Sequence, residues 1–215
     1  WSNDFDALSD DCGATGMATV TFTATDDCGN SSSTTATFTI EDTTAPAIDM
    51  AAMDATVECD GAGNAADLDG WLASNGGAAA SDACSDVTWS NDFDALSDDC
   101  GATGMATVTF TATDACGNSS STTAAFTIVD SAAPAFTYVP ADYTISCEEE
   151  LVYEDATAED ACGDVTVSLI EEIILDDACP YAYTIVRAFT ATDDCGNATN
   201  ATQTISVVDE TAPVF

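Results

Sequence analysis

The 215-residue chain has almost no positive charge, because it contains neither lysine nor histidine and only one arginine, Arg187. Against this arginine stand 39 aspartates and glutamates, which give a formal net charge of −38. Without cations, the chain cannot bind nucleic acid or an anionic membrane surface through phosphate groups. The same absences exclude a Ser-His-Asp triad, a Cys-His pair, a lysine Schiff base and a P-loop lysine. We therefore expect no catalytic residues and no enzymatic activity.

The sequence also lacks an apolar run of about 18 residues, so we expect no membrane insertion. It has ten cysteines instead. Zinc sites built only from cysteine use tight C-x-x-C pairs, whereas the closest cysteines here, Cys147 and Cys162, lie 15 residues apart. The cysteines therefore predict disulfides and a protein that is secreted or displayed at the cell surface. Structural disulfides are favoured over redox-active ones, because no positive charge lowers a thiol pKa.

A near-identical repeat organises the chain. Residues 1–47 recur as residues 89–135 with five differences, so 42 of 47 positions agree at a spacing of 88 residues. Repeats of this length predict domains in series, and we expect the chain to be a segment of a longer array. The expected domains are the C-terminal half of a truncated repeat (1–45), a complete repeat with a short helical insertion at 64–76 (46–133), a diverged complete repeat (134–212) and the start of a next repeat (213–215).

Within a repeat, apolar residues alternate with a period of two, as is typical of half-buried strands. Val108, Phe110 and Ala112 alternate with threonines, and residues 121–130 alternate in the same way. The segment between these two strands contains glycine and asparagine, which favour a hairpin turn. Further strands are expected at 47–50, 55–59 and 87–93. The sequence therefore predicts an all-β fold of tandem immunoglobulin-like antiparallel β-sandwiches in an extended array.

Each repeat carries two motifs, A-T-D-x-C-G-N and, one strand later, D-x-x-A-P. They begin at Ala24, Ala112 and Ala191, and at Asp42, Asp130 and Asp209. In these motifs the chain resembles the HYR-like (hyalin-repeat-like) domains with four cysteines, which have an immunoglobulin-like sandwich fold. The resemblance implies a flavobacterial surface adhesin from the Bacteroidota, exported by type IX secretion and similar to adhesins of gliding motility.

Geometry selects among the cysteine pairings within a repeat. Cys100 and Cys116 flank a strand whose ends lie roughly 27 Å apart at ~3.3 Å per residue, whereas a disulfide needs Cα atoms within ~7 Å. Cys84 and Cys100 likewise bracket the strand around Trp89. The pairs that remain are Cys59–Cys100 and Cys84–Cys116 in the second repeat, and Cys147–Cys179 and Cys162–Cys195 in the third. We expect Cys12 and Cys28 to have partners upstream of Trp1. A loop at 94–105 that folded back along the sheet would change this assignment.

Aspartates recur at positions that suit a calcium site between repeats. D-x-C begins at Asp82, Asp114, Asp160 and Asp193, and each repeat ends in D-x-x-A-P. This linker resembles the calcium-binding linker of cadherin repeats but lacks its second acidic residue. The expected Ca²⁺ ligands are Asp42 with Asp82 and Asp114, and Asp130 with Asp160 and Asp193. The alternative is a solvated acidic surface, because the spacing matches no EF-hand loop.

The function that the sequence favours is a structural stalk in a large secreted cell-surface adhesin. Its expected partners are neighbouring repeats of the same chain, bundled filaments, and a surface polysaccharide or substratum that a domain outside this segment contacts. An array of carbohydrate-binding modules would need an aromatic cluster, for which Trp71 with Trp89 is the only candidate. An extracellular hydrolase would need a pair of catalytic carboxylates. No cofactor is required, and Ca²⁺ at the domain junctions is the one ion expected.

Overall fold

The structure of the protein is a computed structural model that describes residues 1–175, 179 and 181–212. Most of these residues lie in strands, which confirms the predicted all-β class. We call residues 1–45, 46–133 and 134–212 the first, second and third repeat. These boundaries come from the sequence alone and stay predictions.

The strands follow the predicted pattern in each repeat. The first repeat contains β1 (Ser2–Asn3), β2 (Gly16–Thr25) and β3 (Ser31–Ile40). The second contains β4 (Ala47–Met50), β5 (Ala55–Glu58), α1 (Ala65–Ala73), the 3-10 turn η1 (Asn75–Gly77), β6 (Ala79–Ser81), β7 (Thr88–Asn91), β8 (Gly104–Thr113) and β9 (Ser119–Val129). The third contains β10 (Ala135–Tyr138), β11 (Tyr143–Ser146), β12 (Thr157–Glu159), β13 (Val165–Leu175), β14 (Tyr183–Asp193) and β15 (Ala198–Val208).

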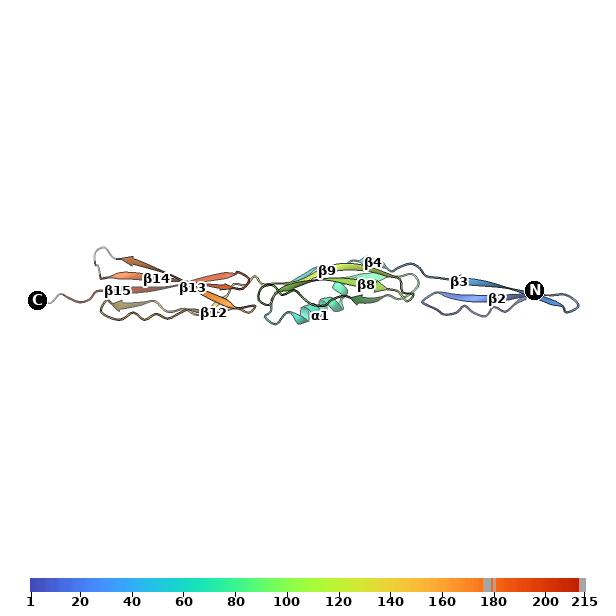
Figure 1. The fold of residues 1–215 in the computed structure, drawn as a ribbon, viewed down its shortest axis with the longest axis horizontal. Coiled ribbons are helices and arrows are strands. Elements are labelled where there is room, and N and C mark those ends of the chain that lie inside the picture. The colour runs from blue at the N-terminus through green and yellow to red at the C-terminus, as the bar shows by residue number, and fades with distance from the viewer. Residues whose placement is uncertain (176–178, 180, 213–215) are drawn as a thin grey trace. The chain divides into compact units, whose positions relative to one another are not determined.

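Each complete repeat has a two-stranded and a four-stranded sheet (Figure 1). The strand orders are β4-β6 and β5-β9-β8-β7 in the second repeat, and β10-β12 and β11-β15-β14-β13 in the third. The first repeat has one sheet, β1-β2-β3. The prediction of antiparallel sheets is confirmed for β13, β14 and β15, but β11 pairs with β15 in parallel. The chain crosses from one sheet to the other between β10 and β11, so β11 joins the second sheet along its edge.

The structure divides into two compact units. One comprises residues 1–55, 66–95 and 106–126, and the other comprises 56–65, 96–105 and the chain from Thr127 onward. The division falls inside the second repeat. No helix in the described part of the chain is long and apolar enough to cross a membrane.

The core of the second repeat consists of the inward side chains of β8 and β9. Val108, Phe110 and Ala112 are completely buried, and Phe126 is 1% exposed. The threonines that alternate with them on β8 face outward and favour strand geometry through their branched Cβ. The period of two in the sequence therefore assigned the correct side chains to the core.

The predicted helical insertion is present as α1. Trp71 projects from this helix onto the core, with its ring 5.2 Å from that of Phe110 and 5.5 Å from that of Phe126. Its indole N–H donates to the carbonyl of Met53 at 3.0 Å. Trp71 is therefore a half-buried residue that packs on the core with its only polar group satisfied.

The described residues of the third repeat form no such helix, and Arg187 takes its place. Arg187 is 2% exposed and lies at the position on β14 that corresponds to Val108 on β8. Its guanidinium carbon lies 5.1 Å from the ring centre of Phe189, the counterpart of Phe110, and 4.9 Å from that of Tyr153. The guanidinium thus covers Phe189 in the third repeat as Trp71 covers Phe110 in the second.

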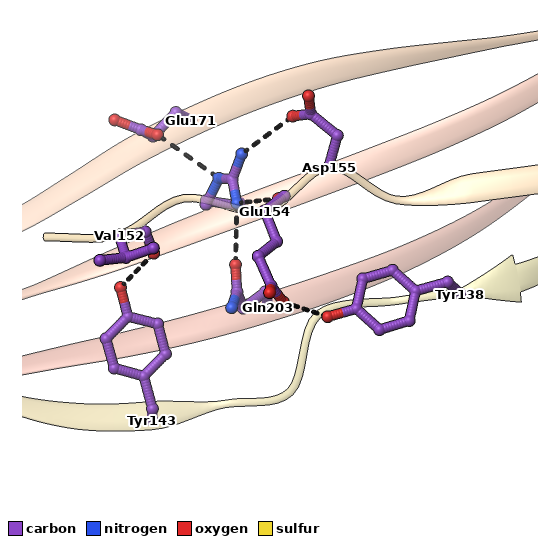
Figure 2. Close-up of polar contacts among 8 residues, drawn as sticks. Tyr138, Tyr143, Val152, Glu154, Asp155, Glu171 and Gln203 are labelled. Carbon is purple, nitrogen blue, oxygen red and sulfur yellow. Dashed lines mark hydrogen bonds and ion pairs between the residues drawn. The ribbon is translucent and has the colours of Figure 1, made fainter.

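Carbonyl and carboxylate oxygens surround the buried guanidinium of Arg187, and Figure 2 labels the residues that carry them, which are Glu154, Asp155, Glu171 and Gln203. Arg187 Nη1 donates to the Glu154 carbonyl at 2.8 Å and to Gln203 Oε1 at 3.0 Å. Asp155 and Glu171 each approach the guanidinium to 3.7 Å. A buried charge persists only when it is paired and hydrogen-bonded in this way. The single arginine of the chain is therefore a structural residue of the third repeat.

Candidate functional site

The disulfides are the most distinctive chemical feature of the molecule, and each one joins two neighbouring repeats. Cys12 bonds to Cys116, with Cα atoms 5.1 Å apart. Two further bonds join the second and third repeats. They are Cys59–Cys162, with Cα atoms 6.1 Å apart, and Cys100–Cys195, with Cα atoms 5.1 Å apart. The other four cysteines, all among the described residues, are free thiols: Cys28, Cys84, Cys147 and Cys179.

The predicted pairing within repeats is wrong. The structure contains none of the four expected bonds, Cys59–Cys100, Cys84–Cys116, Cys147–Cys179 and Cys162–Cys195. The partner of Cys12 lies downstream at Cys116, not upstream of Trp1. The strand-length argument was sound, because Cys100 and Cys116 at the two ends of β8 are not bonded. Partners lie outside the repeat because each bonded cysteine lies near the end of its repeat, next to the adjoining one.

The A-T-D-x-C-G-N motif forms the turn that presents one of these cysteines. Asp114 accepts hydrogen bonds from the Asn118 backbone N–H at 2.9 Å and from the Asn118 side-chain amide at 2.8 Å. The same amide donates to the carbonyl of Asp42, in the linker that precedes the second repeat, at 3.2 Å. Asp193 and Asn197 repeat these contacts in the third repeat. The motif therefore fixes both the turn and its attachment to the preceding linker.

The loop that carries the other cysteine docks through its backbone. Ala14 N–H donates to the carbonyl of Cys84 at 2.8 Å, and Ala102 N–H donates to the carbonyl of Cys162 at 2.6 Å. The preceding glycines, Gly13 and Gly101, have φ of +59° and +57°, and a Cβ at either would overlap the accepting carbonyl. Only glycine combines this conformation with so close a backbone approach. The two junctions are thus built alike, although the first has one disulfide and the second has two.

Two acidic clusters lie beside these bonds. Asp42, Asp82 and Cys84 form one, with ligand atoms within 4.8 Å of one another, and Asp130, Asp160 and Cys162 form the other. Among the described residues, Asp42 Oδ2 is buried without a hydrogen-bond partner. The structure therefore brings together two of the three aspartates predicted at each calcium site.

The third predicted ligand of each site, Asp114 or Asp193, instead accepts the hydrogen bonds that hold its own turn together. Burial raises the pKa of both carboxyls, but hydrogen bonds from Asn118 and Asn197 outweigh it, so each pKa lies below its ordinary value. Burial, with Asp160 and Asp193 nearby, raises the pKa of Asp130. The negative charge of these clusters is not neutralised by any cation among the described residues.

The acidic surroundings also affect the free thiols. Burial and the charges of Asp42, Asp82 and Asp114 raise the pKa of Cys84 above its ordinary value. Burial, followed by the charge of Asp209, raises the pKa of Cys147. Both groups remain thiols at neutral pH, which is the opposite of what a redox-active cysteine requires.

No family model and no curated protein matches the chain. Solved structures that align with it include mouse clustered protocadherin PcdhgC3 EC1-3, at 11% identity over 93% of this chain and 79% of that chain, with a TM-score of 0.33. Drosophila N-cadherin EC1-4 aligns at 12% identity over 92% and 58%, with a TM-score of 0.34. The protocadherin GammaB4 extracellular domain aligns at 16% identity over 91% and 40%, with a TM-score of 0.35. Similarity at this level carries no argument about function, and none of these matches supports the resemblance to HYR-like domains.

Proposed function

We propose that the chain is a load-bearing stalk segment of a large adhesin, secreted to the cell surface. The observation that carries this proposal is that all three disulfides bond one repeat to the next. A peptide linker alone lets neighbouring repeats separate under tension, whereas these bonds carry force past the linker. Disulfides also persist only in an oxidising compartment, which supports an extracellular location.

The finer assignment rests on sequence motifs. A-T-D-x-C-G-N and D-x-x-A-P support a HYR-like repeat of a flavobacterial adhesin, with export by type IX secretion and a part in gliding motility. On this proposal the adhesive contact with polysaccharide or substratum belongs to another domain, and these repeats contact one another and bundle with neighbouring filaments.

A retention assay on polysaccharide-coated beads and a glycan array test the stalk proposal against carbohydrate binding. The oxidised chain should be retained no more strongly than another protein of equal negative charge. A hollow in the third repeat that Tyr138 and Tyr143 help to line is the candidate site for such binding. Saturable retention that Tyr138→Ala abolishes would replace the stalk with the carbohydrate-binding alternative.

We also propose that Ca²⁺ binds at the acidic clusters. Asp42 supports this, because its unpartnered, buried Oδ2 lies within reach of Asp82, and carboxylate oxygens are the ligands that Ca²⁺ prefers. The corresponding pair in the third repeat junction is Asp130 with Asp160. The turn aspartates, Asp114 and Asp193, would add charge close by.

Calorimetric titration with CaCl₂ at fixed ionic strength tests this proposal. Asp42→Asn should remove one of two binding events, whereas Asp49→Asn, at an exposed carboxylate on β4, should leave both. Equal heats for the two variants and the parent chain would mean that the clusters bind no Ca²⁺ and are only a solvated acidic surface.

A further inference from the structure

The cysteines fall into four positions within a repeat. By alignment of the repeats, the first position is Cys59 and Cys147, and the second is Cys84 and Cys162. The third position is Cys12, Cys100 and Cys179, and the fourth is Cys28, Cys116 and Cys195. The three disulfides obey one rule in these terms. A first-position cysteine bonds to the second position of the following repeat, and a third-position cysteine bonds to the fourth position of the following repeat.

The same rule accounts for every free thiol. Cys147 and Cys179 are first- and third-position cysteines of the third repeat, so their partners would lie in a following repeat. Cys84 and Cys28 are second- and fourth-position cysteines, so their partners would lie in residues of a preceding repeat that these 215 do not include. No cysteine whose rule-assigned partner is present remains free.

We propose that the four free thiols are bonding positions for further copies of this repeat, with two disulfides at every junction. This inference shares only the observed bonds with the stalk proposal, and it does not depend on a load-bearing role. It commits to one partner, another repeat with cysteines at the same four positions.

A second observation, independent of the cysteines, points to the same partner. Phe22 and Phe38 of the first repeat correspond to Phe110 and Phe126 in nearly identical sequence, yet they are 37% and 61% exposed. In the second repeat this face is covered by residues that precede β7, including Trp71. The exposed face therefore matches another copy of residues 46–88, the half of a repeat that also carries the first- and second-position cysteines.

The bond-forming step needs an oxidant, which we take to be glutathione disulfide or an equivalent disulfide. One cysteine thiolate attacks the glutathione disulfide, releases one glutathione and forms a mixed disulfide. The partner cysteine then attacks the mixed disulfide, and the second glutathione leaves. Two protein thiols lose two protons and two electrons in total, and one glutathione disulfide becomes two glutathione thiols.

Counting free thiols in a longer chain tests the inference. In this longer chain, residues 1–213 are joined directly to a second copy of residues 47–215. Pro213 therefore takes the place that Pro46 has before the second repeat. This chain is refolded with a glutathione redox buffer, and its thiols are counted in denaturant. The original chain should give four free thiols. The longer chain should also give four, although it has eight more cysteines, because Cys147 and Cys179 bond to Cys84 and Cys116 of the added copy.

Other counts overturn the inference. Eight free thiols would mean that the added junction forms no bonds, and two would mean that cysteines pair within repeats. Two variants of the longer chain sharpen the result. Cys147→Ser in the first copy should raise the count to five by freeing its partner, whereas Cys28→Ser should lower it to three. Two new linked peptides, Cys84–Cys147 and Cys116–Cys179, should appear on mapping, and their absence would contradict the inference even at a count of four.

Discussion

Bonds between repeats should shorten the chain's extension under force by an amount that the cysteine pairing fixes. The shortest covalent path runs from Trp1 to Cys12, across to Cys116, back to Cys100, and across to Cys195. It contains about 47 of the 214 residue steps, the rest being bypassed. At ~3.4 Å per extended residue, with two bridges added, the oxidised chain should extend to about 17 nm and the reduced chain to about 73 nm.

Single-molecule pulling between peptide tags at the two ends measures this difference. The same chain is pulled before and after reduction, so that it serves as its own control. Pairing within repeats would leave a path of about 141 residues and an extension of about 48 nm. A reductant-sensitive length near 48 nm would therefore refute the observed pairing, and a length near 73 nm without reductant would refute disulfides altogether.

Three further results are expected. Phe110→Ala should lower the free energy of unfolding by about 3 to 5 kcal/mol, whereas Phe22→Ala, in the same sequence context but exposed, should cost less than about 1 kcal/mol; equal losses in urea titrations would contradict the assigned core. Arg187→Ala should cost about 1 to 3 kcal/mol because it leaves the buried Gln203 Oε1 without its donor, and a loss below about 0.5 kcal/mol would remove its structural role. Because burial and then the charges of nearby aspartates raise the pKa of Cys84, its alkylation rate should keep rising above pH 9. Asp42→Asn should lower that pKa and speed alkylation at pH 8 about twofold; an unchanged rate would show that the two groups do not interact.

The strands and the insertion could be predicted because their signals are local. Alternation along β8 and β9 identified Phe110 and Phe126 as core, and the apolar face of 64–76 identified α1. The parallel pairing of β11 with β15 could not be predicted, because it depends on where the chain crosses between sheets. The structural role of Arg187 could not be predicted either, because it depends on the third repeat having no counterpart of Trp71.

The cysteine pairing failed for a different reason. Strand length correctly separated Cys100 from Cys116, but which cysteines meet depends on how repeats adjoin, and a single repeat does not contain that information.

The most direct test of the central claim is the mapping of disulfides in the unreduced chain. Digestion at aspartate and mass spectrometry should find the peptide of Cys59 linked to that of Cys162, and the peptide of Cys116 linked to the sequence that surrounds both Cys12 and Cys100. Because that sequence is the same at the two sites, Cys12→Ser should abolish the second link and leave the first. Linkage of Cys59 to the Cys100 sequence, or of Cys84 to Cys116, would contradict bonds between repeats.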